Sequence, residues 1–193
     1  MIIRKLFKFE NAHIVRKCTS KRCRESLHGH SYKAEILMES KFLDNGQMVY
    51  DFGLMKRDIK DLIDSFDHGV SIWNRDDPSF VLAMKEHSER WVMLPVSPSA
   101  EQLSRVLFVL INRYLKLNQM VNGEKEVKLQ SIIIHETDTG YAQCFEEDAY
   151  NDNMGHIELD QIIFSDEIMR EWNDSYLHKK LINGLPFLNP TSL

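Results

Sequence analysis

Residues 27–42 read LHGHSYKAEILMESKF, and this stretch decides the fold that we expect. Apolar and polar residues alternate along it, which is the period of a β-strand with one buried face. In such a strand the side chains of His28 and His30 leave the same face, roughly 6.5 Å apart. The stretch therefore predicts a long strand that presents two imidazoles together.

A second strand is predicted directly before it, over residues 2–13, where apolar residues share the parity of His13. If the two strands pair antiparallel through residues 14–27, His13 comes near the face that carries His28 and His30. Three neutral imidazoles with an open fourth position are the ligand set of a catalytic zinc. Spacing alone leaves a second interpretation open, in which the histidines are simply packed or solvated.

The rest of the chain predicts an α+β domain with the element order ββααββ. A capping box at residues 99–102 opens a strong helix that should end near residue 122, and a turn signal at residues 43–46 precedes a short strand. The other expected elements are a strand at 47–52, a helix at 53–66, strands at 127–136 and 141–145, and a tail helix at 166–183.

The domain is expected to cover residues 1–146, with an irregular insertion at about residues 70–98. Residues 147–193 are expected to form a C-terminal extension whose role the sequence does not indicate.

Composition limits the classes of function. With 193 residues, 43% of them hydrophobic, the chain suits one globular domain with decoration. A formal net charge of -5 argues against direct binding to nucleic acid or to an anionic membrane. No run reaches the ~18 apolar residues of a membrane helix, and the start lacks the apolar core of a signal peptide. The three cysteines lack the spacing of a disulfide scaffold, so we expect a cytoplasmic protein.

Cys23 is the first candidate for acid–base chemistry. It lies in a polar segment, residues 18–25, where neighbouring lysines and arginines would favour its thiolate. A surface thiol without a role is the alternative. Cys18 competes with it in the same segment, whereas Cys144 is expected to be structural.

Two further groups could take part. Asp67 and His68 stand side by side where the helix at residues 53–66 ends, and a carboxylate can hold an imidazole tautomer and raise its basicity. Glu136 ends an apolar strand, where it is either a binding carboxylate or a strand end emerging into water.

Taken in order, the motifs FENAH (residues 9–13), Cys23 followed by HGHSY (28–32), MVYDFGLMK (48–56), FDH (66–68), SPSAEQ (97–102) and HET (135–137) resemble a known enzyme family. They are similar to the 6-pyruvoyltetrahydropterin synthase / 6-carboxytetrahydropterin synthase family.

This resemblance implies a tunnelling fold, in which ββααββ subunits with an antiparallel sheet join into an oligomeric β-barrel, as a trimer or hexamer. By motif, His13, His28 and His30 would bind Zn²⁺, and Cys23 would abstract a proton. The resemblance further implies that Asp67 and His68 form a proton relay. Glu136 would be both a catalytic residue and a pterin contact, and Glu101 would be a second pterin contact.

The implied reaction converts 7,8-dihydroneopterin triphosphate to 6-carboxytetrahydropterin, acetaldehyde and triphosphate, for queuosine and other 7-deazapurines. The motif LHGHSY favours this carboxy branch. The gap between Cys23 and His28 is one residue longer than in the carboxy pattern, so Cys18 remains an alternative for the reactive thiol. Candidates for the triphosphate contact are the basic residues near Cys23, namely Lys17, Lys21, Arg22 and Arg24.

Three alternatives stay open. The chain could be a 6-pyruvoyltetrahydropterin synthase, which eliminates triphosphate and keeps the two-carbon unit, or a dihydroneopterin side-chain lyase for folate. It could also be a zinc- or pterin-binding module without turnover.

Overall fold

The strand predicted from residues 27–42 forms as β2 (His28–Glu39) and pairs antiparallel with β1 (Ile2–His13) along its whole length. The register places His13 directly opposite His28, and buried residues alternate with exposed ones on both strands. A computed structural model describes residues 1–192. The pairing of β1 with β2 places all three histidines on the face that is buried farther along both strands.

These two strands lie in a seven-stranded sheet with the order β7-β6-β2-β1-β3-β4-β8. Pairing is antiparallel from β7 to β1, as expected, and parallel between β1, β3 and β4. The sheet is therefore mixed. Its remaining strands are β3 (Gly69–Trp73), β4 (Trp91–Leu94), β6 (Lys128–Thr137), β7 (Gly140–Cys144) and β8 (Ile163–Phe164).

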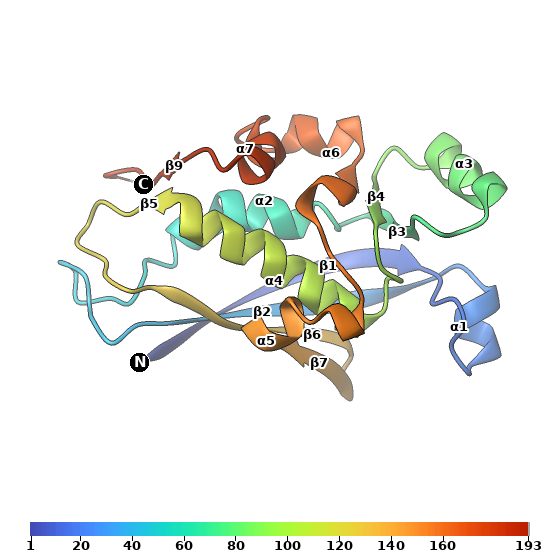
Figure 1. Ribbon diagram of the computed structural model, residues 1–193, viewed down its shortest axis with the longest axis horizontal. Helices are drawn as coiled ribbons and strands as arrows, with labels where there is room; N and C mark the ends of the chain where they lie inside the picture. Colours follow the sequence, from blue (N-terminus) through green and yellow to red (C-terminus); the bar gives the residue numbers. More distant parts are fainter. Residues whose placement is uncertain (193) are drawn as a thin grey trace.

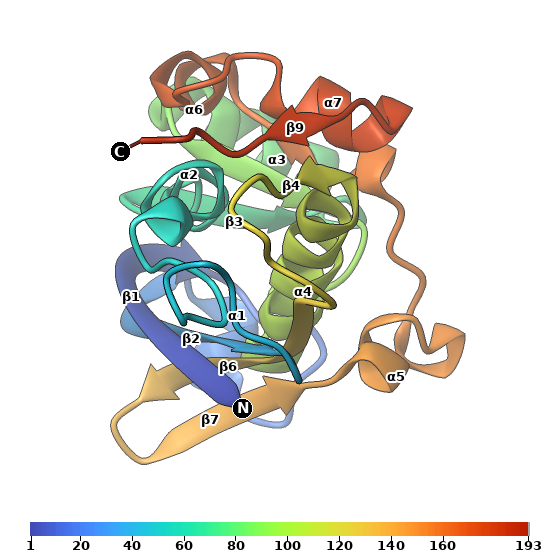
Figure 2. The same cartoon turned by 90° about the vertical axis from the view of Figure 1, so that its left-hand side faces the viewer.

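Helices cover one face of the sheet, and the C-terminal segment lies beyond them. Figures 1 and 2 show α2 (Asp58–Asp64) and α4 (Ala100–Leu117) against the sheet, with α6 (Asp166–Glu171) and α7 (Leu177–Asn183) of the C-terminal segment on their far side and α5 (Glu146–Ala149) near β7. Buried apolar residues of all three layers form one core. The other C-terminal elements are η2 (Asp152–Met154), η3 (Leu159–Gln161) and β9 (Phe187–Leu188), which pairs with β5 (Asn118–Gln119).

The segment at residues 70–98 is more regular than expected. It forms β3, α3 (Pro78–His87) and β4, so its strands extend the sheet instead of leaving it. Asp77 caps α3 by accepting a hydrogen bond from Ser79, and Pro78 occupies the first helical turn, where its missing N–H costs nothing. The apolar strands here are too short to show a clear period in the sequence.

The strand expected at residues 47–52 is absent. Asp44 accepts hydrogen bonds from the N–H groups of Gly46 and Met48, and Gln47 has a left-handed φ of 61°, so the chain turns at this point. Val49 and Tyr50 are buried in the core without pairing to the sheet. The helix expected after them is split into η1 (Leu54–Lys56) and α2.

Other boundaries also differ. Residues 18–25, expected as a loop, contain the short helix α1 (Lys21–Glu25), and α4 ends at Leu117, before residue 122. The tail helix is broken into α6 and α7 because Trp172 leaves the helical conformation and buries its ring. Within residues 1–192, no helix is both long and apolar enough to cross a membrane.

Candidate active site

Three imidazoles meet at the end of the β1–β2 ladder. His13 pairs with His28 across the two strands, and His30 follows two residues farther along β2 on the same face. Each offers a ring nitrogen, and these nitrogens all lie within 4.8 Å of one another. The ring centroids are 4.6 to 5.2 Å apart. This cluster, His13, His28 and His30, is called the histidine cluster below.

Backbone carbonyls orient two of the rings. Nδ1 of His13 donates to the Pro98 carbonyl at 2.5 Å, and Nδ1 of His28 donates to the Ser26 carbonyl at 2.9 Å, since a carbonyl can only accept. Both rings are thereby held in the Nδ1–H tautomer, in which Nε2 carries the lone pair; on His13 the Tyr32 hydroxyl lies 3.4 Å from that nitrogen. A carbonyl on the second nitrogen is the usual support of a metal-binding histidine. The donor set fits a metal ion of the kind that prefers imidazole, which includes zinc, copper, iron and nickel.

Burial favours the neutral imidazole that metal binding needs. The side chain of His13 is fully buried, and burial, together with the nearby His28 and His30, lowers its pKa to about 4, although the Pro98 carbonyl acts in the opposite direction. At neutral pH this ring therefore carries no proton that a metal would have to displace.

Glu136 on β6 and Tyr32 on β2 stand beside the histidine cluster. Oε1 of Glu136 lies 3.7 Å from Nε2 of His13 and 3.9 Å from Nε2 of His30, and the Tyr32 hydroxyl lies 3.5 Å from the same oxygen. The Glu136 side chain is 34% exposed, so a ligand can reach it. A partly open carboxylate next to the cluster can accept hydrogen bonds from the N–H groups of a bound molecule.

Tyr32 was not anticipated as a site residue, although it lies two positions beyond His30 on the same strand face. Its hydroxyl is 3.2 Å from Nδ1 of His13. Burial raises its pKa well above the usual value, and the charges of Glu136 and Glu101 add to the effect. Glu101, exposed in the first turn of α4, thus acts on the same site from the helix side.

The thiols differ in their surroundings. The Cys23 carbonyl accepts from Val15 N–H at 3.1 Å, which holds α1 beside the end of β1, next to His13 in sequence. Cys18 donates its S–H to the Ser20 carbonyl at 3.2 Å. Cys144 is buried, and burial raises its pKa to about 12, so it is protonated at neutral pH. The thiols with access to solvent are Cys18 and Cys23.

Asp67 and His68 do form a pair, with Asp67 Oδ2 accepting from Nδ1 of His68 at 2.9 Å. The structure does not bring this pair into the histidine cluster. His68 precedes β3, and β1 separates β3 from β2, which carries His28 and His30. Adjacent strands are roughly 4.8 Å apart, so about 10 Å of sheet separates β3 from the strand of His28 and His30, while His13 lies on β1, the strand next to β3. A hollow of about 390 Å³ has both His68 and His30 among its lining residues.

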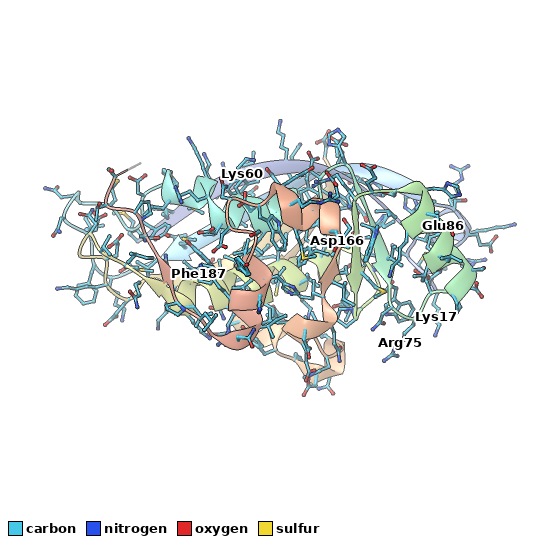
Figure 3. All side chains as sticks on the ribbon, turned by 90° about the horizontal axis from the view of Figure 1, so that it is seen from above. Lys17, Lys60, Arg75, Glu86, Asp166 and Phe187 are labelled. Carbon is cyan, nitrogen blue, oxygen red and sulfur yellow. The ribbon has the colours of Figure 1, made fainter. Side chains whose placement is uncertain are left out.

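Basic residues gather at the end of the molecule that carries α1 and α3. Lys17 Nζ and Arg75 Cζ lie 5.8 and 5.9 Å from the centre of the Trp73 ring, and Figure 3 labels both side chains at this end. Lys21 and Arg24 of α1 form ion pairs with Glu25. Arg75 was not among the basic residues singled out in the sequence, because it is 52 positions away from Cys23 along the chain.

Sequence comparisons agree with this geometry. The model of the family described as 6-pyruvoyl tetrahydropterin synthase matches residues 2–147, which include the histidine cluster and Glu136. A 6-carboxy-5,6,7,8-tetrahydropterin synthase of Helicobacter pylori is 35% identical over 184 residues, covering 95% of this chain and 92% of that protein. This second match continues past the family domain into the C-terminal segment.

Solved structures share the fold. An uncharacterized protein from Wolinella succinogenes superposes with a TM-score of 0.63 at 24% identity, over 76% of this chain and 98% of that one. The 6-pyruvoyl tetrahydropterin synthase of Caenorhabditis elegans gives a TM-score of 0.52 at 18% identity, over 75% and 94% of the two chains. At these identities the likeness concerns the fold alone.

Proposed function

Because the chain belongs to the 6-pyruvoyl tetrahydropterin synthase family, we propose that it is a 6-carboxy-5,6,7,8-tetrahydropterin synthase. The reaction takes 7,8-dihydroneopterin triphosphate and water to 6-carboxytetrahydropterin, acetaldehyde and triphosphate, as a step towards queuosine. The observation that carries the proposal is the likeness to the Helicobacter pylori enzyme, which extends over nearly the full length of both chains.

Zinc is the metal we propose for the histidine cluster. Three imidazoles, two of them held in the Nδ1–H tautomer, suit a catalytic zinc that keeps one position open, and within residues 1–192 the cluster consists of these three side chains. Bound there, zinc would supply a Lewis acid that lowers the pKa of the side-chain hydroxyls of the substrate.

Glu136 is proposed to hold the pterin ring, by accepting hydrogen bonds from its amino and ring N–H groups. Its exposure and its position 3.7 to 3.9 Å from two of the cluster nitrogens support this role. We assign Glu101 to a secondary contact, since its charge reaches Tyr32 from the start of α4. Together these carboxylates would set the ring so that its side chain points at the cluster.

Cys23 is proposed as the group that removes a proton from the substrate side chain, with the Asp67–His68 pair as its relay. In one chain, β1 stands between the pair and the strand of His28. We therefore propose that the relay forms across a subunit boundary in a trimer or hexamer. The three free cysteines fit a reducing compartment such as the cytoplasm.

The relay has a direct test. Cys23→Ala and His68→Ala should each be inactive as pure proteins, whereas subunits of the two variants, mixed after dissociation and reassembled, should regain activity because some sites then contain both intact groups. If the mixture stays inactive while mixed wild-type subunits recover, a relay between subunits is wrong.

The reaction itself is tested by incubating the zinc-loaded protein with 7,8-dihydroneopterin triphosphate and assaying acetaldehyde and 6-carboxytetrahydropterin. We expect both products in equal amounts. A 6-pyruvoyl product without acetaldehyde would identify a 6-pyruvoyltetrahydropterin synthase instead. Turnover of unphosphorylated dihydroneopterin alone would point to a folate-type side-chain lyase, and zinc or pterin binding without any turnover would leave a binding module.

A further inference from the structure

The turn that carries the Asp67–His68 pair has an unfavourable backbone conformation. His68 has a φ of 51°, in the left-handed region that non-glycine residues seldom adopt. Its imidazole is 77% exposed, so packing of the ring does not hold the turn in place. Other groups must therefore fix the backbone between Phe66 and Gly69.

One of these groups is the buried side chain of Asn11 on β1, which is 4% exposed. Its amide donates to the Phe66 carbonyl at 2.7 Å and to the Gly69 carbonyl at 3.1 Å, on either side of the pair. Glu10 N–H, next to it on β1, donates to Asp67 Oδ1 at 2.7 Å. These bonds tie the turn to β1.

Arg90, just before β4, holds the turn from the opposite side. Its Nε donates to the Asp67 carbonyl at 2.8 Å, and its Nη2 donates to the Asp64 carbonyl at 2.7 Å. The Arg90 carbonyl in turn accepts from Val70 N–H at 3.1 Å, immediately after the turn. One residue thus bonds the backbone at the end of α2, at Asp67 itself and at the start of β3.

The remaining nitrogen of the guanidinium, Nη1, pairs with Glu171 at the end of α6, in the C-terminal segment. Two adjacent residues anchor that segment to α2. Trp172 Nε1 donates to Ser65 Oγ at 2.9 Å, and Asn173 N–H donates to Asp61 Oδ2 at 2.8 Å. The C-terminal segment is therefore fixed against α2 at the place where its carboxylate meets Arg90.

We propose that Arg90, held by Glu171 of the C-terminal segment, is a positioning residue for the Asp67–His68 pair. Its guanidinium makes three bonds in different directions, and a planar fork of five N–H donors can satisfy all of them whereas a lysine ammonium cannot do so in the same geometry. The role rests on the proposed function, in which His68 moves a proton. It gives the C-terminal segment a part in the chemistry of the site.

The first test does not depend on catalysis. In the intact protein, nitrogen-15 NMR reports which nitrogen of His68 carries the proton, with the signals assigned by their absence from His68→Gln. We expect the Nδ1–H tautomer in the wild type, because Asp67 accepts from Nδ1. In Arg90→Ala the turn loosens, and we expect a mixture of both tautomers.

The second test is kinetic. Arg90→Ala and Arg90→Lys should each lower kcat by about tenfold or more, with KM for the pterin triphosphate changed less than about twofold, because misplacing a proton-transfer group affects the transition state more than binding. Zinc content should stay at the wild-type level. Added guanidinium ion should restore part of the activity of Arg90→Ala and none of that of His68→Gln.

Glu171→Ala tests the contribution of the C-terminal segment, with Glu167→Ala as its matched control. Both carboxylates lie on α6, but Glu167 pairs with the exposed Arg170. We expect Glu171→Ala to lower kcat severalfold and to mix the His68 tautomers, and Glu167→Ala to do neither.

The outcomes separate the two proposals. Wild-type tautomer and wild-type kcat in Arg90→Ala would overturn the positioning role. Glu171→Ala indistinguishable from Glu167→Ala would overturn the role of the C-terminal segment. If wild-type protein turned over no pterin triphosphate, the proposed function would fail, and the tautomer measurements would still decide whether Arg90 positions His68.

Discussion

His13 determines the electrostatic character of the histidine cluster, because it is the fully buried member. Its Nδ1–H is committed to the Pro98 carbonyl, and its pKa is lowered to about 4 by burial. The folded protein therefore keeps this imidazole neutral in a range of pH where an unfolded chain, with an ordinary histidine pKa near 6.5, takes up a proton. The stability of the metal-free protein should therefore depend on pH in this range.

We predict that the free energy of unfolding of the metal-free protein falls as the pH falls from about 6.5 to about 4. Above that range both states are neutral at His13 and stability is complete; within it the unfolded state binds the extra proton, which costs up to about 3 kcal/mol. Urea denaturation at several pH values measures the slope. His13→Gln should show a shallower slope, though not a flat one, since burial also lowers the pKa of His178. Equal slopes would contradict the prediction.

Metal content separates the roles of two side chains. We predict that His28→Ala loses zinc, because two imidazoles hold the ion far more weakly than three, whereas Cys23→Ala keeps zinc and loses turnover. Elemental analysis of the purified variants, with wild type as the control, measures the first effect, and the acetaldehyde assay measures the second. A fully active Cys23→Ala would move the role to Cys18 or remove it.

At the scale of single residues, the sequence predicted which histidines come together better than it predicted the groups that orient them. The spacing of His28 and His30 indicated a shared face, and the ladder confirms that His13 joins them. The Pro98 carbonyl could not be foreseen, because it is a backbone group 85 residues away from His13. The Asp67–His68 pair was foreseen as a pair, but the strand that separates it from His28 depends on a sheet order that no local pattern encodes.

Among the elements, α4 links the core to the site. Its apolar face packs against the sheet, while the charge of Glu101 in its first turn adds to the rise in the pKa of Tyr32 that burial causes. Ser99 caps the helix by accepting from Gln102 N–H, and the residue before it supplies the carbonyl that orients His13. The start of this helix is therefore both a folding signal and a part of the site.

We predict that Ser99→Ala lowers the free energy of unfolding by about 1 kcal/mol, the usual cost of losing an N-cap. Chemical denaturation measures it. Ser99→Asp, which keeps a capping oxygen, should be close to wild type and serves as the control. If Ser99→Ala and Ser99→Asp were equally destabilised, the loss would not come from the cap.

Strong periodicity explains which elements could be predicted. The strands β1, β2 and β6 and the helix α4 are long, so the spacing of their apolar residues repeats often enough to be recognised in the sequence. The segment at residues 70–98 was expected to be irregular because β3 and β4 have only 5 and 4 residues and are largely apolar on both faces. Residues 47–52 do contain buried apolar side chains, Val49 and Tyr50, but the turn at Asp44 places them in the core without pairing them to the sheet.

On the scale of the whole molecule, the C-terminal segment is integrated into the core. Trp172 is 7% exposed, packs against Phe164 at a centroid distance of 5.1 Å and bonds Ser65. Phe164 belongs to β8, which pairs with β4 at the edge of the sheet. The segment thus contributes to stability through residues that the family domain, residues 2–147, does not contain.

We predict that Trp172→Ala lowers the free energy of unfolding by about 3–5 kcal/mol, the range for removing a large buried aromatic side chain. Tyr176→Ala, at a 62% exposed position in the same segment, should change it by less than about 0.5 kcal/mol. Urea denaturation of both variants makes the comparison. Similar values for the two would mean that the segment does not share the core.

His13 is bonded to the Pro98 carbonyl, 85 residues away, so the three histidines come together only in the folded chain. Binding of a metal ion to the histidine cluster should therefore stabilise the fold. A ligand that binds only the folded state adds RT ln(1 + [L]/Kd) to its stability, about 4 kcal/mol at a thousandfold excess over Kd. We predict that a chelator lowers the melting temperature of wild type but leaves that of His28→Ala unchanged, as calorimetry would measure. Preparations that differ only in the buffers used to purify them would then appear to be proteins of different thermal stability.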